Sequence, residues 1–451
     1  MDREALEQLS RDQLIELVLS LLQRVADLEA RTEELTQPPK TPDNSSTPPS
    51  RGQKPNAMRP SKEERRRKGR PGVARGLHRA PDRVVDTVVG TCPHCHAAMP
   101  ASDQTPQAVY DRIELVPIAP NVTRVRLFGG KCGCCGRRVV ASAPPGLEPG
   151  SPFGKSIAAL VVYLHYAHAI GLARLKVLLD EVFGLQISEG GLCNLLARAG
   201  KPLAVETAAI AEQVKAARVV CSDETSARVK GRNHWEWVFV TAQAVLHQIR
   251  PSRAKAVPQE LFGAIKPGVW VSDMLGSQRG HGKEWQVCLA HLLRDAQYAI
   301  DCGDNAFGTA FKRLLLRAIA IGRRREDLKD STLRQYQADL DRRLDRVLAT
   351  GSVTKAGKTL RKRLAHDRAH LFVFVTDRDV PYTNNVSERA LRPSVIFRKV
   401  TNGFRSDWGA ETYAAFRSVV STATANQKSA LADIRAVLSA PPPLASSAVP
   451  G

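Results

Sequence analysis

Residues 217–273 constrain the fold of this 451-residue chain more than any other stretch. Short runs of β-branched and aromatic residues within them, bounded by polar or glycine-containing turns, predict four strands. A helix is predicted between the third and the fourth, in RAKAVPQELFGAI. The predicted strands are RVVCS (218–222), WEWVFVT (235–241), AVLHQI (244–249) and VWVSD (269–273).

An aspartate stands at the end of the first and of the fourth predicted strand, at Asp223 and Asp273. Three strands, a helix and a strand are the opening order of the ribonuclease-H-like fold, in which the first and fourth strands lie side by side. We therefore expect the two aspartates to face one another at one edge of the sheet. Two adjacent, partly buried carboxylates repel each other unless a cation lies between them. A pair of Mg²⁺ ions would relieve that repulsion and promote phosphodiester chemistry.

A site of this kind needs a third carboxylate, and Glu388 is the candidate. It lies in YTNNVSERALRPSVIFRK (382–399), near the start of a predicted helix that Thr383 or Asn384 would cap. Taken singly, each of the three acids is more often a surface residue or a cap. Their joint pattern, two strand-end aspartates and one helix glutamate, indicates a metal site.

The surroundings of Glu388 suit metal binding beside a phosphate backbone. Asn385 and Arg392 lie about one turn to either side of it on the same helix face, and Arg389 is adjacent. Glu224, next to Asp223, is a further acid, but strand alternation should turn its side chain to the opposite face. The candidate DNA contacts in and after this helix are Arg389, Arg392, Arg398 and Lys399.

The chain is strongly basic, with a formal net charge of +21 and a pI near 9.9. A chain with this charge is expected to bind a polyanion, and nucleic acid is the first candidate. An anionic membrane is the rival, but no apolar run reaches the roughly 18 residues of a spanning helix. The polar, acidic N-terminus MDREALEQLS does not resemble a signal peptide. We therefore expect a cytoplasmic protein that binds no membrane.

Close to half of the net charge lies in residues 51–80, which hold eleven Lys and Arg against two Glu. A flexible arm here would neutralise DNA phosphates, and the alternative is a solvated tail. Residues 36–60 are rich in Pro, Ser and Thr and cannot form a packed core, so we expect 37–80 to be a disordered basic linker. The candidate DNA contacts in the arm are Arg65, Arg66, Arg67, Lys68 and Arg70.

Residues 1–36 are expected to form a coiled coil, because leucine recurs every seventh residue between residues 10 and 35. Val18 and Val25 occupy the alternate seam position, and this combination favours two parallel strands. Ser10 and Gln13 would form a capping box. The alternative is a single amphipathic helix packed on its own domain. The seam leucines are Leu14, Leu21, Leu28 and Leu35.

Nine cysteines in a reducing compartment indicate metal or core positions rather than disulfides. Two C-x-x-C knuckles stand out, and four thiolates would close a tetrahedron around one structural Zn²⁺. Cys134 could replace a neighbour, and His94 or His96 could also serve. The alternative is a set of reduced cysteines on turns. The expected zinc ligands are Cys92, Cys95, Cys132 and Cys135.

The segment between the two knuckles, YDRIELVPIAPNVTRVRLFGG (110–130), alternates like the β-hairpin of a zinc ribbon. We therefore expect residues 81–145 to be a zinc-binding domain. Residues 151–216 look helical, with a helix–turn–helix form in which Gly184 marks the turn and Ser188 caps the second helix. That helix would either dock in DNA or only build a core.

The chain resembles the large transposase of the insertion-sequence-sixty-six family, a bacterial D-D-E transposase family. The match covers about residues 10–435. It rests on SDET with HWEWVFV, on VWVSDMLG, on CLAHLLRDAQ and on NNVSERALRPSVIFRKVTNGFRSDWGAETYAAFRSVVSTA. The resemblance implies that Asp223, Asp273 and Glu388 bind two Mg²⁺ ions, or Mn²⁺. It also implies hydrolysis at the element's 3′ ends, followed by direct attack of those hydroxyls on target DNA.

The same resemblance implies a multidomain α+β chain with a coiled coil, a zinc ribbon, a helical segment and a ribonuclease-H-like core. The core would span residues 217–435, with an all-helical insertion at about 295–370 whose arginines either hold DNA or form a solvated face. We expect residues 436–451 to be a disordered tail; many members of the family carry a further element there. The implied partners are double-stranded DNA (terminal inverted repeats and target), a second copy through the coiled coil, and companion proteins of the element.

Cys288 and His291, in CLAH, match a C-x-x-H pair that follows the second aspartate in several D-D-E families. Two residues cannot close a zinc site, so we expect structural support for the core, or simply a buried thiol and a satisfied histidine. Two other functions remain open: a zinc-containing DNA-binding regulator without catalysis, and a non-transposing nuclease. A transposase would act in the bacterial cytoplasm at the nucleoid.

Overall fold

The computed structural model describes residues 10–41, 43–45 and 75–440. The chain divides into two compact units, one of residues 1–53, 125–178 and 186–451 and the other of 54–124 and 179–185. The basic arm with Arg65, Arg66, Arg67, Lys68 and Arg70 lies outside the described residues. The tail was predicted to be disordered from residue 436, but residues 436–439 are helical, and those from 441 on lie outside the described residues. None of the described helices is long and apolar enough to cross a membrane.

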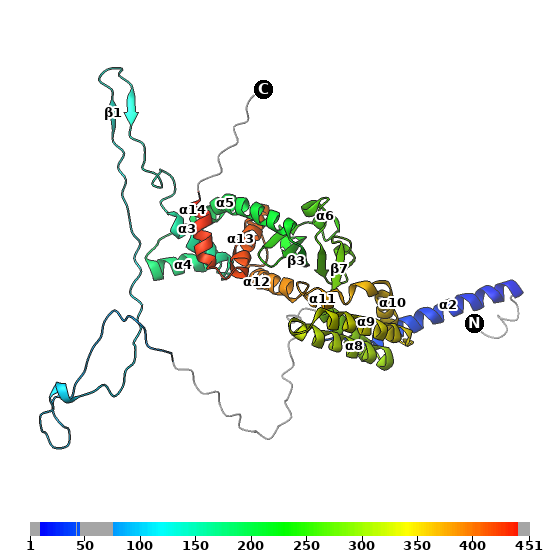
Figure 1. Cartoon of the computed structure of the whole chain (residues 1–451). Coiled ribbons are helices and arrows are strands. Elements are labelled where there is room, and N and C mark those ends of the chain that lie inside the picture. The colour runs from blue at the N-terminus through cyan, green and yellow to red at the C-terminus, as the bar shows by residue number, and fades with distance from the viewer. Residues whose placement is uncertain (1–9, 42, 46–74, 441–451) are drawn as a thin grey trace. The chain divides into compact units, whose positions relative to one another are not determined.

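A five-stranded mixed sheet forms the centre of the first unit (Figure 1), with the strand order β5–β4–β3–β6–β7. β3 pairs antiparallel with β4 and parallel with β6, so the first and fourth predicted strands do lie side by side. The fifth strand, β7, was not predicted. The strands are β3 (Val219–Val229), β4 (Arg232–Val240), β5 (Val245–Arg250), β6 (Val269–Ser272) and β7 (Glu284–Val287).

The prediction that the first strand ends at Asp223 is wrong. β3 continues for six residues beyond it, to Val229, because its antiparallel partner β4 continues as well. What ends near Asp223 is the parallel partner β6, which stops at Ser272.

Helices cover the sheet. On the face opposite Asp223, Phe262 of α6 (Ala256–Phe262) packs edge-on against Phe239 and Trp270. α5 (Glu189–Ala216), α12 (Asn385–Thr401) and α13 (Asp407–Ala425) also contact the sheet, and α13 packs on β5 and α5. The first unit further contains α3 (Lys155–Tyr166) and α14 (Ala430–Ser439), which pack on one another. α4 spans Leu172–Phe183, and the following Gly184 has a φ of +64°.

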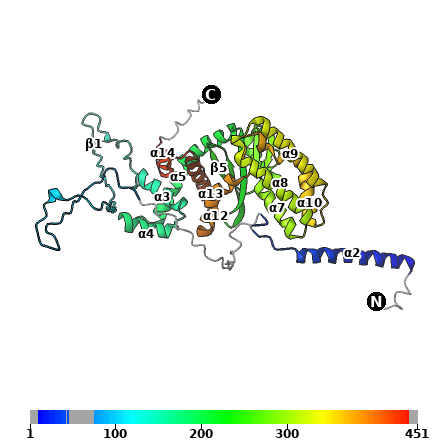
Figure 2. The ribbon, with the colours of Figure 1, turned by 60° about the horizontal axis from the view of Figure 1, so that its bottom comes forward.

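The predicted insertion is helical. α7 and α8 pack together, α9 packs on α8, and α10 packs on α7, so these helices form one bundle (Figure 2). The buried faces of α8 and α9 are lined by leucine and phenylalanine, while their arginines lie mostly at the surface. The helices are α7 (Leu289–Asp301), α8 (Asn305–Arg324), α9 (Asp330–Ala349) and α10 (Lys355–His366), followed by the short α11 (Val373–Thr376).

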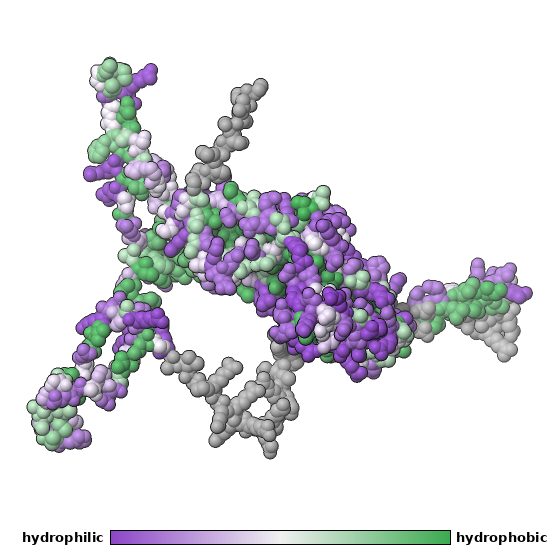
Figure 3. Space-filling model, viewed as in Figure 1, coloured by the Kyte–Doolittle hydropathy of each residue, from purple (hydrophilic) through white to green (hydrophobic). Residues whose placement is uncertain are grey.

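α2 (Arg11–Thr36) is the N-terminal helix, and its predicted capping box is present. The Ser10 hydroxyl accepts from the backbone N–H of Gln13 at 3.3 Å, and the Gln13 side chain accepts from the N–H of Ser10 at 2.9 Å. Large apolar side chains along this helix are exposed (Figure 3), among them Val18, Leu21, Val25 and Leu28.

The start of the predicted linker is packed on α7. Asn44 donates a 2.9 Å hydrogen bond to Asp301, and Gln37 accepts one of 3.1 Å from the Tyr298 hydroxyl. Lys40 lies over the Tyr298 ring. The expectation of a structureless segment from residue 37 is therefore wrong for this stretch, because its amide groups find partners on the helix.

Each cysteine knuckle forms a tight turn of the same kind. Cys92 N–H bonds to the Ala97 carbonyl and Cys132 N–H to the Arg137 carbonyl, both at 2.9 Å. The hairpin predicted within 110–130 is not found, since residues 110–128 have no assigned strand and are exposed. The strands are instead β1 (Gly129–Lys131) and β2 (Arg138–Val140), which flank the second knuckle.

Candidate active site

Asp223 and Asp273 lie next to one another because of the register between two parallel strands. Cys221 of β3 pairs with Val271 of β6, so the two aspartates follow two residues later on both strands. Both are partly exposed. Burial, the charge of Glu224 and the charge of Asp273 together raise the pKa of Asp223 to about 8. The site therefore contains two acids whose shared ionisation is unfavourable without a positive charge.

Glu388 reaches the same region from α12. It lies in the first turn of this helix and its side chain is 30% exposed. Its Oε1 is 3.7 Å from His291 Nε2 and 3.7 Å from an Arg294 guanidinium nitrogen. Both distances exceed hydrogen-bond length, so Glu388 is held by charge and is not locked in place.

His291 lies in the first turn of α7, where its charge acts on all three acids. It contacts Glu388 and interacts electrostatically with both Asp223 and Asp273. Burial by itself would lower the pKa of His291, but the Cys288 thiol and the charge of Asp273 raise it to about 9. The C-x-x-H pair thus places a positive charge among the carboxylates. Sequence reasoning assigned the pair to structural support and missed this position.

Asn384 ties the three elements of the site together. It is fully buried and is the N-cap residue of α12. Its side-chain amide donates to the Ser222 carbonyl at 2.8 Å, and its backbone N–H donates to Cys288 Sγ at 3.1 Å. Its side-chain oxygen accepts from Ser387 at 2.8 Å. The strand of Asp223, the helix of Glu388 and the start of α7 therefore share one side chain.

Glu224 points away from this group, as strand alternation requires. Its carboxylate accepts a 2.8 Å hydrogen bond from Arg253 and another from Gln278, which in turn accepts from Trp270. Arg253 also stacks on Trp235, with 4.6 Å to the ring centroid. Glu224 is thus held by two side chains, Arg253 and Gln278, and we do not count it as a ligand.

The donor set fits a divalent cation in chemistry, since carboxylate oxygens are the ligands that Mg²⁺ prefers. The two adjacent aspartates and the raised pKa of Asp223 describe a site that gains from a cation. Over the described ranges, however, no three His, Cys, Asp or Glu side chains are grouped closely enough to hold a metal ion. Glu388 is turned toward His291 and Arg294 and would have to swing toward the aspartates.

Of the candidate DNA contacts on α12, Arg389, Arg392 and Lys399 are exposed. Arg398 is not. Its side chain is 14% exposed, lies 3.6 Å from Glu236 and donates to Thr225 at 3.2 Å. Its assignment as a DNA contact overlooked that α12 packs this side chain onto the sheet, where a buried acid attracts it.

Arg398 belongs to a buried polar cluster behind the site. Glu236 is fully buried and accepts hydrogen bonds from Ser394 at 2.6 Å and from His247 Nδ1 at 3.0 Å. The Tyr413 hydroxyl donates to Ser394 at 2.9 Å. The cluster joins β4, β5, α12 and α13, and so fixes the helix of Glu388 against the sheet.

Backbone N–H groups in each knuckle point at the first cysteine. Those of His94 and Cys95 lower the pKa of the Cys92 thiol, and those of Cys135 and Cys134 lower that of Cys132. Thiolates stabilised in this way are suited to metal binding. The sharing of one Zn²⁺ by the two knuckles stays a prediction.

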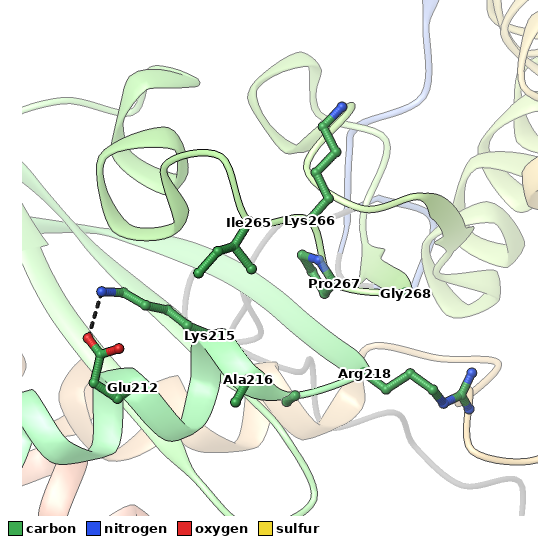
Figure 4. A pocket seen from close by; sticks show the side chains of 9 residues that line it. Glu212, Lys215, Ala216, Arg218, Ile265, Lys266, Pro267 and Gly268 are labelled. Carbon is green, nitrogen blue, oxygen red and sulfur yellow. Dashed lines mark hydrogen bonds and ion pairs between the residues drawn. The ribbon is translucent and has the colours of Figure 1, made fainter.

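An open depression lies elsewhere, at the opposite ends of β3 and β6 (Figure 4). Lys215 and Lys266 line it, together with Arg218, which is already paired with Asp377 and Asp379. It contains none of the predicted site residues, and the carboxylates sit at the other end of the same strands.

A family model described as "Transposase IS66 family" matches residues 150–412, which include all three acids. A comparison with curated proteins finds no match.

Proposed function

The chain belongs to the IS66 transposase family, and from this premise we propose that it cuts the ends of an insertion sequence and joins their 3′ hydroxyls to target DNA. In this proposal the core is ribonuclease-H-like and Asp223, Asp273 and Glu388 are its metal ligands. The adjacency of Asp223 and Asp273 carries the proposal, since two neighbouring aspartates at one strand edge need a cation.

The three acids would hold two Mg²⁺ ions, or Mn²⁺, which when bound activate the attacking oxygen and stabilise the leaving 3′ oxygen. In the first step water attacks the phosphodiester at the element's end, and the bond to the 3′ oxygen breaks. In the second step this 3′ hydroxyl attacks a target phosphodiester, forming a new P–O bond as the target strand breaks.

The chain's own residues prepare this site. Asn384 fixes the start of α12 against β3, which limits where Glu388 can reach. His291 and Arg294 balance the carboxylate charge, and each lies 3.7 Å from Glu388, which would swing from them toward the aspartates. The exposed Arg389 and Arg392 are placed to meet phosphates beside the acid.

We further propose that two chains associate through α2. The observation in favour is the exposure of its seam residues, since Leu21 and Leu28 are 52% and 58% exposed. An uncovered heptad stripe on one helix is the pattern that a second copy buries. Light scattering of the protein and of a Leu21→Glu/Leu28→Glu variant tests this, and a variant that stays dimeric would contradict it.

Incubation of purified protein with Mg²⁺ and DNA carrying the element's ends tests the main proposal. We expect nicks at the 3′ ends of the terminal repeats, followed by joined products with target DNA. Indiscriminate nicking would indicate a nuclease. Tight binding of the ends without any cutting would indicate a DNA-binding regulator.

A further inference from the structure

The β3–β4 hairpin extends beyond the rest of the sheet. The last residue pair that β4 makes with β5 is Trp235 with Arg250, and β6 has already ended at Ser272. Residues 227–234 therefore form a ribbon two strands wide. Its turn is made by Lys230 and Gly231, both with positive φ.

The loop after α12 is locked onto this ribbon. Phe404 N–H donates to the Arg228 carbonyl, and Lys230 N–H donates to the Phe404 carbonyl, both at 2.8 Å. Gly403 has a φ of +94°, and a Cβ there would lie 2.8 Å from the Arg228 carbonyl oxygen. Phe404 is 8% exposed, with its ring 5.1 Å from that of Tyr413. We call residues 226–234 and 402–408 together the hairpin–loop surface.

This surface is basic, and Arg228 donates a 3.0 Å hydrogen bond to the Gly231 carbonyl within the turn. Arg228, Arg232 and Arg405 are exposed, and in the part of the chain that the structure describes none has a carboxylate partner. Lys230 is also exposed but is paired with Asp407. Trp408, at the edge, is 40% exposed. A rigid ribbon that carries unpaired arginines suits a polyanion of regular shape.

We propose that the hairpin–loop surface binds the phosphate backbone of duplex DNA about six base pairs from the bond that is cut. This inference rests on the proposed function, because it takes Asp223 as the cutting site. Arg232 pairs with Val229, which stands six residues beyond Asp223 on β3 and on the same face of the sheet, and this span at about 3.3 Å per residue is roughly 20 Å. Phosphates of one DNA strand advance about 3.4 Å per base pair, so the same span is about six steps. The length of β3 beyond Asp223 therefore sets the distance between the proposed cutting site and the proposed phosphate contact.

The first test measures how binding depends on salt, with a random-sequence 40-base-pair duplex as the probe. A triple variant, Arg228→Gln, Arg232→Gln and Arg405→Gln, removes three cations and keeps side-chain length. Since each phosphate contact contributes about 0.9 to the slope of log K against log salt, the slope should become about 2 to 3 less steep. The matched control changes three exposed cations elsewhere, Lys201→Gln, Lys428→Gln and Arg435→Gln, and should leave the slope unchanged.

A second variant works in the opposite direction. Asp407→Asn removes the acid that pairs with Lys230 and frees one cation. The slope should become steeper by about 1. This gain cannot arise from misfolding, so it keeps the inference testable even if the triple variant is unstable.

Ethylation interference then locates the contact. The probe is a duplex ending flush at the element's cut end, so that binding is read without cutting. Ethyl groups about six phosphates from that end should weaken binding of the wild-type protein and have no effect on the triple variant. An unchanged slope in the triple variant, or interference confined to other phosphates, would overturn the inference. Wild-type protein that shows the contact but never cuts would refute the proposed function alone.

Discussion

The side-chain amide of Asn384 donates a 2.8 Å hydrogen bond to the carbonyl of Ser222, the residue before Asp223. The same residue caps the helix of Glu388 and meets Cys288 at the start of α7. One buried amide therefore sets how far the third acid stands from the first two. A tether of this kind acts on the site without touching the DNA.

Replacement of Asn384 by serine should impair metal use more than folding. Serine is also a good N-cap residue, so the helix start survives, but its short side chain cannot reach Ser222. Loss of a buried hydrogen bond, about 1–3 kcal/mol, should lower the cleavage rate roughly tenfold and raise the Mg²⁺ concentration for half-maximal cleavage. A Mg²⁺ titration of end cleavage measures this.

Ser387→Ala is the matched control, since it removes the other side-chain contact of Asn384 and leaves the tether to Ser222. Its Mg²⁺ requirement should stay near that of the wild type. Equal requirements in wild type and Asn384→Ser would show that the tether does not position Glu388.

Asp223 should make the stability of the metal-free protein fall as pH rises. Burial and the charges of Glu224 and Asp273 raise its pKa from 3.8 to about 8. A carboxyl group that binds its proton more tightly in the folded state stabilises the fold below the lower value, and this contribution is lost between the two values. In EDTA, Asp223→Asn should therefore raise the melting temperature relative to wild type at pH 8, and much less at pH 5.

Added Mg²⁺ should reverse this difference. At pH 8 the ion should raise the melting temperature of the wild type more than that of Asp223→Asn, because only the wild type has both aspartates to bind it. Identical Mg²⁺ responses of the two proteins would mean that no ion binds between Asp223 and Asp273.

The knuckle cysteines should differ in their importance for zinc. Cys95→Ser should release the metal, whereas Cys134→Ser should retain it, since Cys134 stands between the two predicted ligands of its knuckle. Zinc content per chain after gel filtration measures both. The zinc prediction fails if the wild type contains no zinc, and the assignment of ligands fails if Cys134→Ser loses it as well.

The buried cluster behind the site should be important for stability. Glu236→Ala leaves Arg398 and His247 buried without their partner, and breaking a buried ion pair from one side costs about 3–5 kcal/mol. Urea unfolding should show a loss of this size. The exposed Glu411→Ala serves as control and should change stability by less than about 0.5 kcal/mol. A similar small effect at Glu236 would contradict a structural role for the cluster.

The order of strands could be predicted from the sequence, and with it the meeting of Asp223 and Asp273, because strand-forming runs and the acids after them are local signals. The end of β3 could not be predicted. The six residues after Asp223, ETSARV, are mostly polar, as in a turn, yet all of them pair with β4. Conversely, residues 110–128 alternate like a hairpin, but alternation alone does not supply a partner surface.

The fine structure of the site depends on contacts between distant segments, which no local pattern encodes. No residue pattern near Arg398 predicts that its side chain lies 3.6 Å from Glu236, which stands 162 positions earlier in the chain. Likewise, the role of His291 follows from where α7 begins relative to both aspartates. A signal did exist for Asn384, as a cap before Glu388, but its bond to Ser222 is a tertiary contact.

The most direct measurement compares cutting of the element's ends by single variants of the acids, in Mg²⁺ and with DNA binding measured alongside. We expect Asp223→Asn, Asp273→Asn and Glu388→Gln to bind the ends and to lose cleavage by at least about a thousandfold. Glu224→Gln, whose side chain faces Arg253 and Gln278, should still cut. If Glu388→Gln cut as fast as the wild type, or Glu224→Gln lost activity as fully as Asp223→Asn, the assignment of the three acids would be wrong.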